Sequence, residues 1–182
     1  MDASKAPDAR LTELLKAHFH AVWRAVRRLG VMEDVADDAA QEVFIVAARK
    51  LDSIEPGSEL RFLYGIALRI AANARRARLN RREVGAEEAL IAASHALHGE
   101  ALLERKRLRE LLDVVLDELP DDLRTAFVLF ELEGFSMREI SAILEVPAGT
   151  VASRLRRGRE AFQAAAERVR ARVGDVPVGD EP

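Results

Sequence analysis

The sequence contains no cysteine, which excludes disulfide bonds and thiolate metal sites built from this chain. Glycine and proline are scarce, with 10 and 6 copies in 182 residues, and runs of β-branched residues are missing. Alanine, leucine, arginine and glutamate dominate instead, and all four favour helices. We therefore expect an all-α protein.

Long apolar runs are also missing. The first ten residues, MDASKAPDAR, lack the apolar core of a signal peptide. No uninterrupted apolar stretch reaches the length that a membrane-spanning helix needs. These features predict a protein that works in the cytoplasm without membrane insertion.

Motifs for catalysis or cofactor binding do not stand out. The sequence shows no glycine-rich phosphate loop, no nucleophile elbow and no paired-carboxylate motif. His18 and His20 point to different sides of one helix, and no carboxylate or cysteine near His95 and His98 completes a metal site. We expect no metal, no cofactor and no enzymatic activity of the chain's own.

Charge is distributed in blocks, although the net charge is only -3. Acidic residues predominate in residues 34–59 and again in residues 110–145. Residues 61–82 and 147–172 each contain seven arginines, and the first of these blocks has no acid. The alternation of acid and base is typical of a protein that binds two kinds of surface at once.

Apolar spacing predicts three helices before position 83. The first starts after Asp8, which caps it, and ends at Gly30. The second covers roughly residues 34–51, and the third residues 59–82, with the loop LDSIEPGSEL between them. The residues expected to face inward on the second helix are Val35, Ala39, Val43, Phe44 and Ala47.

Weak periodicity in residues 83–99 divides the chain, and we interpret this stretch as a flexible linker. A helix follows that ends at Pro120, and another that is capped by Asp121 or Asp122 and closed by Gly134. The expected architecture is two small helical domains, residues 8–82 and 100–172. Residues 173–182, with two Gly-Asp pairs and two prolines, form a frayed tail.

A helix-turn-helix is predicted in the second domain. Ser136 lies three residues before Glu139, the spacing of a capping box that starts a helix. Glu145-Val146-Pro147 forms the corner, because proline removes a donor and disfavours helix in the residue before it. The next helix begins near Ala148, and its inward side carries Val151, Leu155, Gly158 and Phe162.

The opposite side of this last helix presents hydroxyls and guanidiniums, on Thr150, Ser153, Arg156 and Arg157, with Arg154 and Arg159 on its flanks. Arginine donates two hydrogen bonds to a guanine edge or neutralises a phosphate. A solvated amphipathic helix would also carry outward arginines. The capping box, the three-residue corner and the basic helix together favour a helix that lies in the major groove of DNA.

Two motifs in this order resemble a known family. The segment LPDDLRTAFVLFELEGFSMREISAILEVPAGTVASRLRRGREAF resembles region four of bacterial RNA polymerase sigma factors, especially the extracytoplasmic-function group. Upstream, ADDAAQEVFIVAARKLDSI and FLYGIALRIAANARRARLNRR resemble region two. The matching positions are Asp38, Gln41-Glu42, Phe44, Lys50-Leu51, Pro147, Gly149-Thr150-Val151, Ser153-Arg154-Leu155 and Arg157.

The resemblance implies a sigma factor that binds core RNA polymerase, recognises a two-part promoter and aids its melting. The residues that would contact the clamp helices of the largest polymerase subunit are Asp34, Asp37, Asp38, Gln41 and Glu42. Region four would sit on the polymerase flap and read the minus-thirty-five element through Thr150, Ser153, Arg154, Arg156 and Arg157. The family also implies an anti-sigma factor as partner, and association with the nucleoid when polymerase is bound.

The minus-ten element would be bound by the remaining region-two surface. The loop that would capture a flipped base consists of Ser53, Ile54, Glu55, Pro56, Gly57 and Ser58. The helix residues that would bind the melted strand and adjacent duplex are Arg61, Phe62, Tyr64, Arg69, Asn73 and Arg76. Trapping an unstacked base offsets part of the cost of melting, and a single strand needs positive charge and aromatic surface.

Several positions depart from the common family pattern, among them Ala39-Ala40, where larger aliphatic residues are usual. Phe62 stands where tryptophan is common, Arg69 where asparagine is frequent, and Ala152 where a basic residue is usual. Two other functions remain open at this point. A stand-alone helix-turn-helix regulator would not need the acidic helix followed by seven arginines, and a helical scaffold would not show steep salt dependence of DNA binding.

Overall fold

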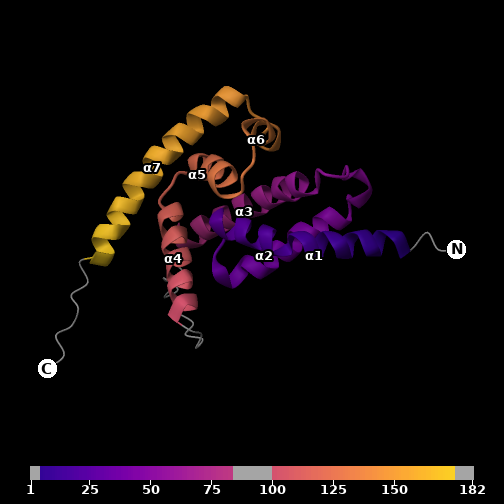
Figure 1. Ribbon diagram of the computed structural model, residues 1–182, viewed down its shortest axis with the longest axis horizontal. Helices are drawn as coiled ribbons and strands as arrows, with labels where there is room; N and C mark the ends of the chain where they lie inside the picture. The colour runs from indigo at the N-terminus through magenta and orange to yellow at the C-terminus, as the bar shows by residue number, and fades with distance from the viewer. Residues whose placement is uncertain (1–4, 84–99, 175–182) are drawn as a thin grey trace.

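The computed structural model describes residues 5–83 and 100–174, which form seven α-helices and no strand (Figure 1). The all-α prediction is confirmed. The helices are α1 (Lys5–Arg28), α2 (Glu33–Ala48), α3 (Glu59–Glu83), α4 (Glu100–Asp117), α5 (Asp121–Phe127), α6 (Met137–Leu144) and α7 (Ala148–Gly174). A 3-10 turn, Leu51–Ser53, follows α2, and a π-helical turn, Val128–Leu132, continues α5.

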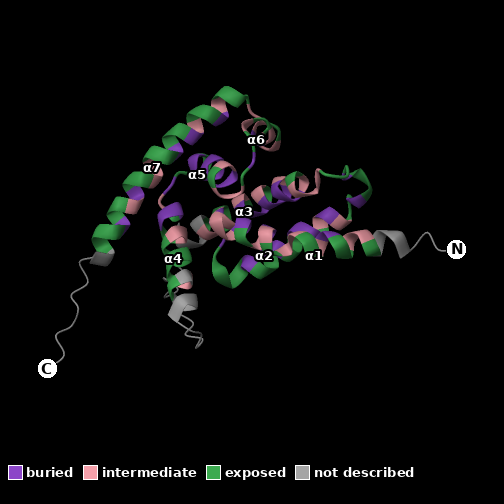
Figure 2. Ribbon diagram, viewed as in Figure 1, coloured by how far each residue is buried: buried purple, intermediate pink, exposed green. Residues whose placement is uncertain are grey.

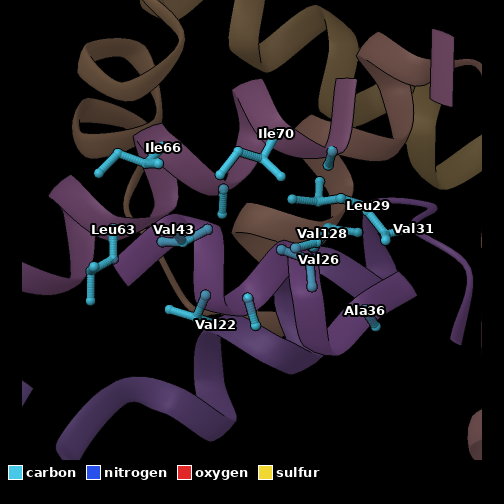
Figure 3. Close-up of a cluster of buried hydrophobic side chains, with 14 of the residues drawn as sticks. Val22, Val26, Leu29, Val31, Ala36, Val43, Leu63, Ile66, Ile70 and Val128 are labelled. Atoms are coloured by element: carbon cyan, nitrogen blue, oxygen red, sulfur yellow. The ribbon is translucent and has the colours of Figure 1, made fainter. Parts of the chain in front are cut away.

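Helices α1, α2 and α3 pack pairwise against one another. Their core contains Val22 and Val26 from α1, Val43 from α2 and Leu63 from α3, all fully buried (Figure 3). Gly30 lies between α1 and α2. Its φ of 91° is in the left-handed region, which glycine adopts without strain. The predicted stop at Gly30 is therefore confirmed. The predicted start is wrong, because α1 begins at Lys5 and Asp8 lies inside the helix instead of capping it.

The inward face of α2 differs from the prediction at one position. Val35 is 38% exposed, whereas Ala36 is fully buried. Ala36, Ala40, Val43 and Ala47 recur at spacings of four, three and four, and form the inward line. Val35 lies beside that line at the first turn of the helix.

The start of α5 also differs. Neither Asp121 nor Asp122 caps it, because Pro120 occupies the N-cap position and no side chain there bonds to the free amides. The two aspartates lie in the first turn, where their charge interacts favourably with the helix dipole. The predicted end at Gly134, with φ of 73°, is confirmed.

The helix-turn-helix forms as predicted. Ser136 Oγ accepts from the Glu139 amide at 3.3 Å, and the Ser136 amide donates to Glu139 Oε2 at 2.8 Å. Glu145 adopts the left-handed conformation with φ of 54° and ends α6. Ser141 Oγ donates to the Val146 carbonyl at 2.6 Å and holds the corner closed.

The inward side of α7 follows the predicted line. Val151, Leu155 and Gly158 are buried, and the Phe162 ring stacks on Phe127 with centroids 4.6 Å apart. A Cβ added to Gly158 would lie 3.0 Å from the Leu123 carbonyl oxygen. Helices α5 and α7 therefore approach so closely that only glycine fits there without movement.

Residues 5–83, the N-terminal half, and residues 100–174, the C-terminal half, are in contact. Buried side chains of both halves meet where α4 and α5 lie against α1 and α3 (Figure 2). Val128, from the π-helical turn, lies in one cluster with Val26 of α1 and Leu29, the residue after α1 (Figure 3). The predicted linker, residues 83–99, falls almost wholly outside the described residues, as does the predicted tail from residue 175 on.

Candidate polymerase and nucleic-acid interfaces

The first three turns of α7 carry the predicted DNA-contacting residues, and much of this part of the helix is exposed (Figure 2). Ser153, Arg156 and Arg157 are exposed, while Thr150 and Arg154 are half-buried. Packing of Val151 and Leu155 against the rest of the C-terminal half fixes this orientation. The structure therefore brings all five residues together on the first three turns of a rigid helix.

Ion pairs within the chain occupy part of this surface. Arg154 Nε lies 3.3 Å from Asp122 Oδ2, and Arg156 Nη1 lies 2.6 Å from Glu160 Oε1. Arg157 has a long hydrogen bond from its Nε to the Ser153 carbonyl, at 3.4 Å. Arg154 and Arg156 would have to exchange a carboxylate for DNA, whereas Arg157 would have to give up only this weak backbone contact.

Helix α2 carries the predicted polymerase-contacting residues on its solvent side. Asp34, Asp37, Asp38, Gln41 and Glu42 are all exposed. Asp37 Oδ1 accepts a hydrogen bond from Trp23 Nε1 at 2.8 Å. The only tryptophan therefore supports the acidic surface in addition to its packing on the core.

Exposed apolar residues accompany these acids, and sequence reasoning missed them. Ile45 is 54% exposed, and Met32 and Val35 are each 38% exposed, on α2 or immediately before it. Apolar side chains within a charged surface are typical of protein interfaces. Their only sequence signal is that they fall off the inward line of the helix.

The predicted base-capturing loop is anchored at one end and exposed at the other. Ile54 is 3% exposed and belongs to the core, so its side chain does not face solvent. Arg10 of α1 donates to the Leu51 carbonyl at 3.0 Å and to the Ile54 carbonyl at 2.5 Å. Ser53, Glu55, Pro56 and Gly57 are exposed, and Ser58 is half-buried.

Arg10 is a second residue that sequence reasoning missed. It lies more than forty positions from the loop that it holds, and its place in the first helix gave no signal of that contact. Its guanidinium bonds to the carbonyl of the first residue of the short 3-10 turn and to that of the residue after the turn, which fixes where the exposed part of the loop begins.

Helix α3 presents its charged and its aromatic candidates differently. Arg61, Arg69, Asn73 and Arg76 are exposed, and Arg76 Nη2 donates to Asn73 Oδ1 at 3.0 Å. Phe62 is half-buried and packs on the core. The charged side chains are thus accessible, but neither of the two predicted rings is freely exposed.

Tyr64 is only 1% exposed and lies between the two halves. Its ring meets Phe135 edge-on, with centroids 4.9 Å apart, and its hydroxyl donates to Glu133 Oε2. Burial, together with the Glu133 carboxylate, raises the pKa of Tyr64 far above its usual value. In this arrangement the Tyr64 ring is closed to a DNA base.

A groove of about 520 Å³ separates the exposed side of α3 from α6. Arg69, Asn73 and Arg76 line one wall, and Ile143, Leu144 and Glu145 line the other. Arg69 Nη2 lies 3.9 Å from Glu145 Oε1 across it, with both side chains largely exposed. Three of the residues predicted to bind the melted strand therefore face the C-terminal half.

Two kinds of site are absent from the part of the chain that the structure covers. Within residues 5–83 and 100–174, no group of three or more histidine, cysteine, aspartate or glutamate side chains is arranged to hold a metal ion. No helix in these two ranges is long and apolar enough to span a bilayer.

Comparison with known proteins gives consistent matches. Residues 109–162 match the family model of sigma-70, region 4. The chain is 38% identical over 166 residues to the ECF RNA polymerase sigma-E factor of Escherichia coli, covering 85% of this chain and 86% of that one. It is 36% identical over 168 residues to the RNA polymerase sigma-H factor of Pseudomonas aeruginosa, covering 87% of each.

Two solved structures have a similar fold. The sigma factor RpoE of Bartonella quintana, in complex with the anti-sigma factor NepR, matches with a TM-score of 0.66 and 26% identity, covering 86% of this chain and 96% of that one. CnrH, in complex with the cytosolic domain of CnrY, matches with a TM-score of 0.62 and 24% identity, covering 86% and 87%.

Proposed function

This chain belongs to the extracytoplasmic-function family of RNA polymerase sigma factors, and we propose which of its surfaces carry out that function. A sigma factor directs transcription initiation at specific promoters. The observation that carries the assignment of surfaces is their separation by charge. An acidic face with exposed apolar residues lies on α2, and an outward basic face follows the capping box on α7.

The α7 surface is proposed to read the minus-thirty-five element. Ser153, Arg156 and Arg157 are exposed on α7. The corner before α7 fixes where the helix starts, and the packing of its inward side fixes which side faces solvent. Good bidentate base contacts contribute roughly 1–3 kcal/mol of discrimination each. Because Arg157 has no carboxylate partner among the described residues, we expect it to contribute most.

The α2 surface is proposed to bind the clamp helices of the largest polymerase subunit. Asp34, Asp38 and Glu42 are exposed and offer a negative surface to a basic partner. Complementary charge speeds docking and fixes orientation, and the exposed Ile45 adds apolar contact. We assign residues 8–82 to the domain that binds the clamp helices, and residues 100–172 to a second domain that binds the polymerase flap.

The loop around Pro56 and the exposed side of α3 are proposed to hold the melted minus-ten strand. Pro56 and Gly57 are exposed at the tip of a loop that Ile54 and Arg10 anchor. Arg61, Arg69 and Arg76 supply positive charge along the next helix. An anchored loop with an exposed tip suits the capture of one unstacked base.

Partners and location follow from the same proposal. Two similar solved structures are complexes, one with an anti-sigma factor and one with the cytosolic domain of CnrY. We infer that this chain too has an anti-sigma partner and acts with polymerase in the cytoplasm, on the nucleoid. Any nucleotide chemistry then belongs to polymerase and none to this chain. The alternative of a stand-alone regulator is disfavoured, because the similarity to sigma factors covers both halves.

The test is run-off transcription with purified core polymerase and a promoter library. The chain should direct initiation at a specific set of templates. Ser153→Ala with Arg157→Ala should reduce selection of the upstream element while polymerase binding stays intact. Asp38→Lys with Glu42→Lys should reduce polymerase affinity first. If no template gives initiation that depends on this chain, the proposal is wrong.

A further inference from the structure

The loop between α2 and α3, residues 49–58, is held by a residue from a distant part of the chain. Arg10 lies on the second turn of α1, and its guanidinium donates to the Leu51 carbonyl at 3.0 Å and to the Ile54 carbonyl at 2.5 Å. Figure 1 shows the first turns of α1 and this loop at the same end of the molecule. Because a guanidinium is a rigid fork of donors, the contact fixes the two carbonyls relative to α1.

The foot of the loop is also buried. Leu51 is 6% exposed and Ile54 is 3% exposed, and both belong to the same apolar cluster as Leu14 of α1. Burial of these side chains determines where the loop leaves the core, but it does not by itself determine the direction of the peptide groups. The two bonds from Arg10 supply that direction, and the second of them acts on the last buried residue before the exposed tip.

The tip beyond Ile54 forms a defined turn. The Ser58 amide donates to the Glu55 carbonyl at 3.0 Å, and the Ser58 hydroxyl donates to the same carbonyl at 2.8 Å. Pro56 and Gly57 are the two central residues, and Gly57 has φ of 83°. Proline followed by a glycine with positive φ is the signature of a type II turn. The tip is therefore stiff in itself, and its position depends on the joint at Ile54.

Arg10 also brings a positive charge to the foot of the loop. Both of its acceptors are neutral carbonyls, and within the two ranges that the structure describes no carboxylate forms an ion pair with it. A positive charge near a single strand favours binding, because the strand carries one phosphate per nucleotide. Positioning of the loop and attraction of the strand are thus two separate roles, and Arg10→Lys distinguishes them.

We propose that Arg10 is a positioning residue for base capture: by joining α1 to the foot of the loop, it holds the Pro56–Gly57 tip where an unstacked minus-ten base is received. The proposal rests on the proposed function of the loop. It predicts that Arg10 acts on the selection of one base, and leaves binding of the clamp helices and of the minus-thirty-five element unchanged. An ammonium group keeps the charge but lacks the fork that bridges two carbonyls.

The test uses holoenzyme reconstituted from core polymerase and the full-length chain, on a template that run-off selection has identified. Each base of its minus-ten element is replaced in turn by the other three, and open-complex formation is measured for every template. Gly57→Ala identifies the position that the loop reads. A Cβ there meets no atom within 4 Å, so this substitution strains only the positive φ of the tip and should change the base preference at one position.

Arg10→Ala should lower the base preference at that same position by about tenfold, the change expected when a hydrogen bond of a charged group is lost. Arg10→Lys should lower it almost as much, because the charge remains but the bridge does not. Lys16→Ala is the matched control, since it removes an exposed positive charge from the same helix, and it should keep the preference of the parent chain. Affinity for a minus-thirty-five duplex should be the same in all three variants.

Arg10→Lys decides the matter if circular dichroism shows that Arg10→Ala has lost helix, because it retains most of the side chain as well as the charge. An unchanged preference in Arg10→Lys would overturn the positioning role and leave only attraction of the strand. A loss of preference spread evenly over the minus-ten element would overturn it too. Failure of the proposed function of the loop would look different, because Gly57→Ala would then change the preference at no position.

Discussion

Helices α3 and α7 have similar composition but different surroundings. They contain 25 and 27 residues, and each includes seven arginines. Helix α3 packs against α1 and α2 of its own half and against α6 of the other, whereas α7 packs against α4, α5 and α6, which all belong to the C-terminal half. One basic helix is central and partly covered, and the other is peripheral and open. Burial, more than charge, decides which arginines can meet DNA.

The comparison also shows that arginine content overstates the DNA-binding surface. On α3, Arg75 donates to the Leu29 carbonyl and pairs with Asp121 at 2.9 Å. On α7, Arg168 and Arg172 both bond to Glu118, the residue after α4. The hydrogen bond from Arg168, followed by that from Arg172, lowers the pKa of this carboxyl. These arginines hold helices together, so the basic blocks are partly structural.

Arg124→Ala should have the largest effect, because it removes a buried guanidinium of α5 that bonds to the end of α4. Arg124 is 3% exposed, donates from Nε to the Leu116 carbonyl at 2.5 Å, and reaches Asp117 at 2.8 Å. Asp117 is 50% exposed, so we expect a loss of about 2–3 kcal/mol in the free energy of unfolding, below the roughly 3–5 kcal/mol of a fully buried pair. Urea denaturation measures it.

Arg138→Ala is the control for that substitution, since Arg138 is exposed on α6. Its effect should stay within about 0.5 kcal/mol. Equal effects of the two substitutions would mean that the bonds of the buried Arg124 guanidinium add nothing to the free energy of unfolding.

Most of the fold could be predicted from the sequence, because local signals determine it. The stop at Gly30, the Ser136–Glu139 capping box and the inward line of α7 each depend on residues within one or two turns. The start of α5 could not be predicted from the same rules. Proline takes the N-cap position there, and Asp121 instead pairs with Arg75, far away in the sequence.

The candidate surfaces were predictable only where exposure follows from helical period. The acids of α2 and the hydroxyls and arginines of α7 lie outward as expected. The burial of Tyr64 could not be foreseen, because it depends on Phe135 and Glu133, about seventy positions away. A contact between the two halves does not change the periodic spacing of apolar residues in the sequence of either half.

Gly158→Ala tests whether close packing against α5 holds α7 in place. The added Cβ would lie 3.0 Å from the Leu123 carbonyl oxygen, a backbone atom that cannot swing away. Overpacking of this kind costs about 1–3 kcal/mol, and we expect weaker binding of a minus-thirty-five duplex as α7 moves away from α5. Titration of a labelled duplex and thermal unfolding measure both effects.

Gly149→Ala is the matched control, because a Cβ there meets no atom within 4 Å. It should leave stability unchanged or raise it by up to about 1 kcal/mol, through the lower entropy of the unfolded chain. If both alanine variants behave alike, close packing of α7 on α5 does not position α7 for the proposed DNA contact.

Ser136→Ala weakens the start of the helix-turn-helix without touching α3. Loss of an N-cap hydroxyl costs about 1 kcal/mol. Hydrogen bonds from the Ser136 side chain, and then its backbone, lower the pKa of Glu139 in the folded state. Stability from a lowered carboxyl pKa is present above the unfolded pKa and lost as pH falls. The difference between variant and parent should therefore shrink in acid, as urea denaturation at several pH values would show.

Glu160→Gln has the smallest expected effect on stability. It tests whether the ion pair between Glu160 and Arg156 weakens DNA binding by the exposed α7 surface. Glu160 and Arg156 form an exposed pair at 2.6 Å, which contributes only about 0.3–0.5 kcal/mol. Once freed, Arg156 no longer has to leave a carboxylate to reach DNA. We expect affinity for a minus-thirty-five duplex to rise by about twofold, the size of effect that this pair energy allows.

Glu167→Gln makes the same change of charge on an exposed position two turns further along α7. A general gain in attraction to DNA would appear in both variants, whereas release of Arg156 should favour Glu160→Gln alone. Adding Arg156→Ala to Glu160→Gln should abolish the gain if the pair is the cause. A gain that survives Arg156→Ala would show that Glu160 repels phosphate directly, and that the arginines of α7 are as open to DNA as their exposure implies.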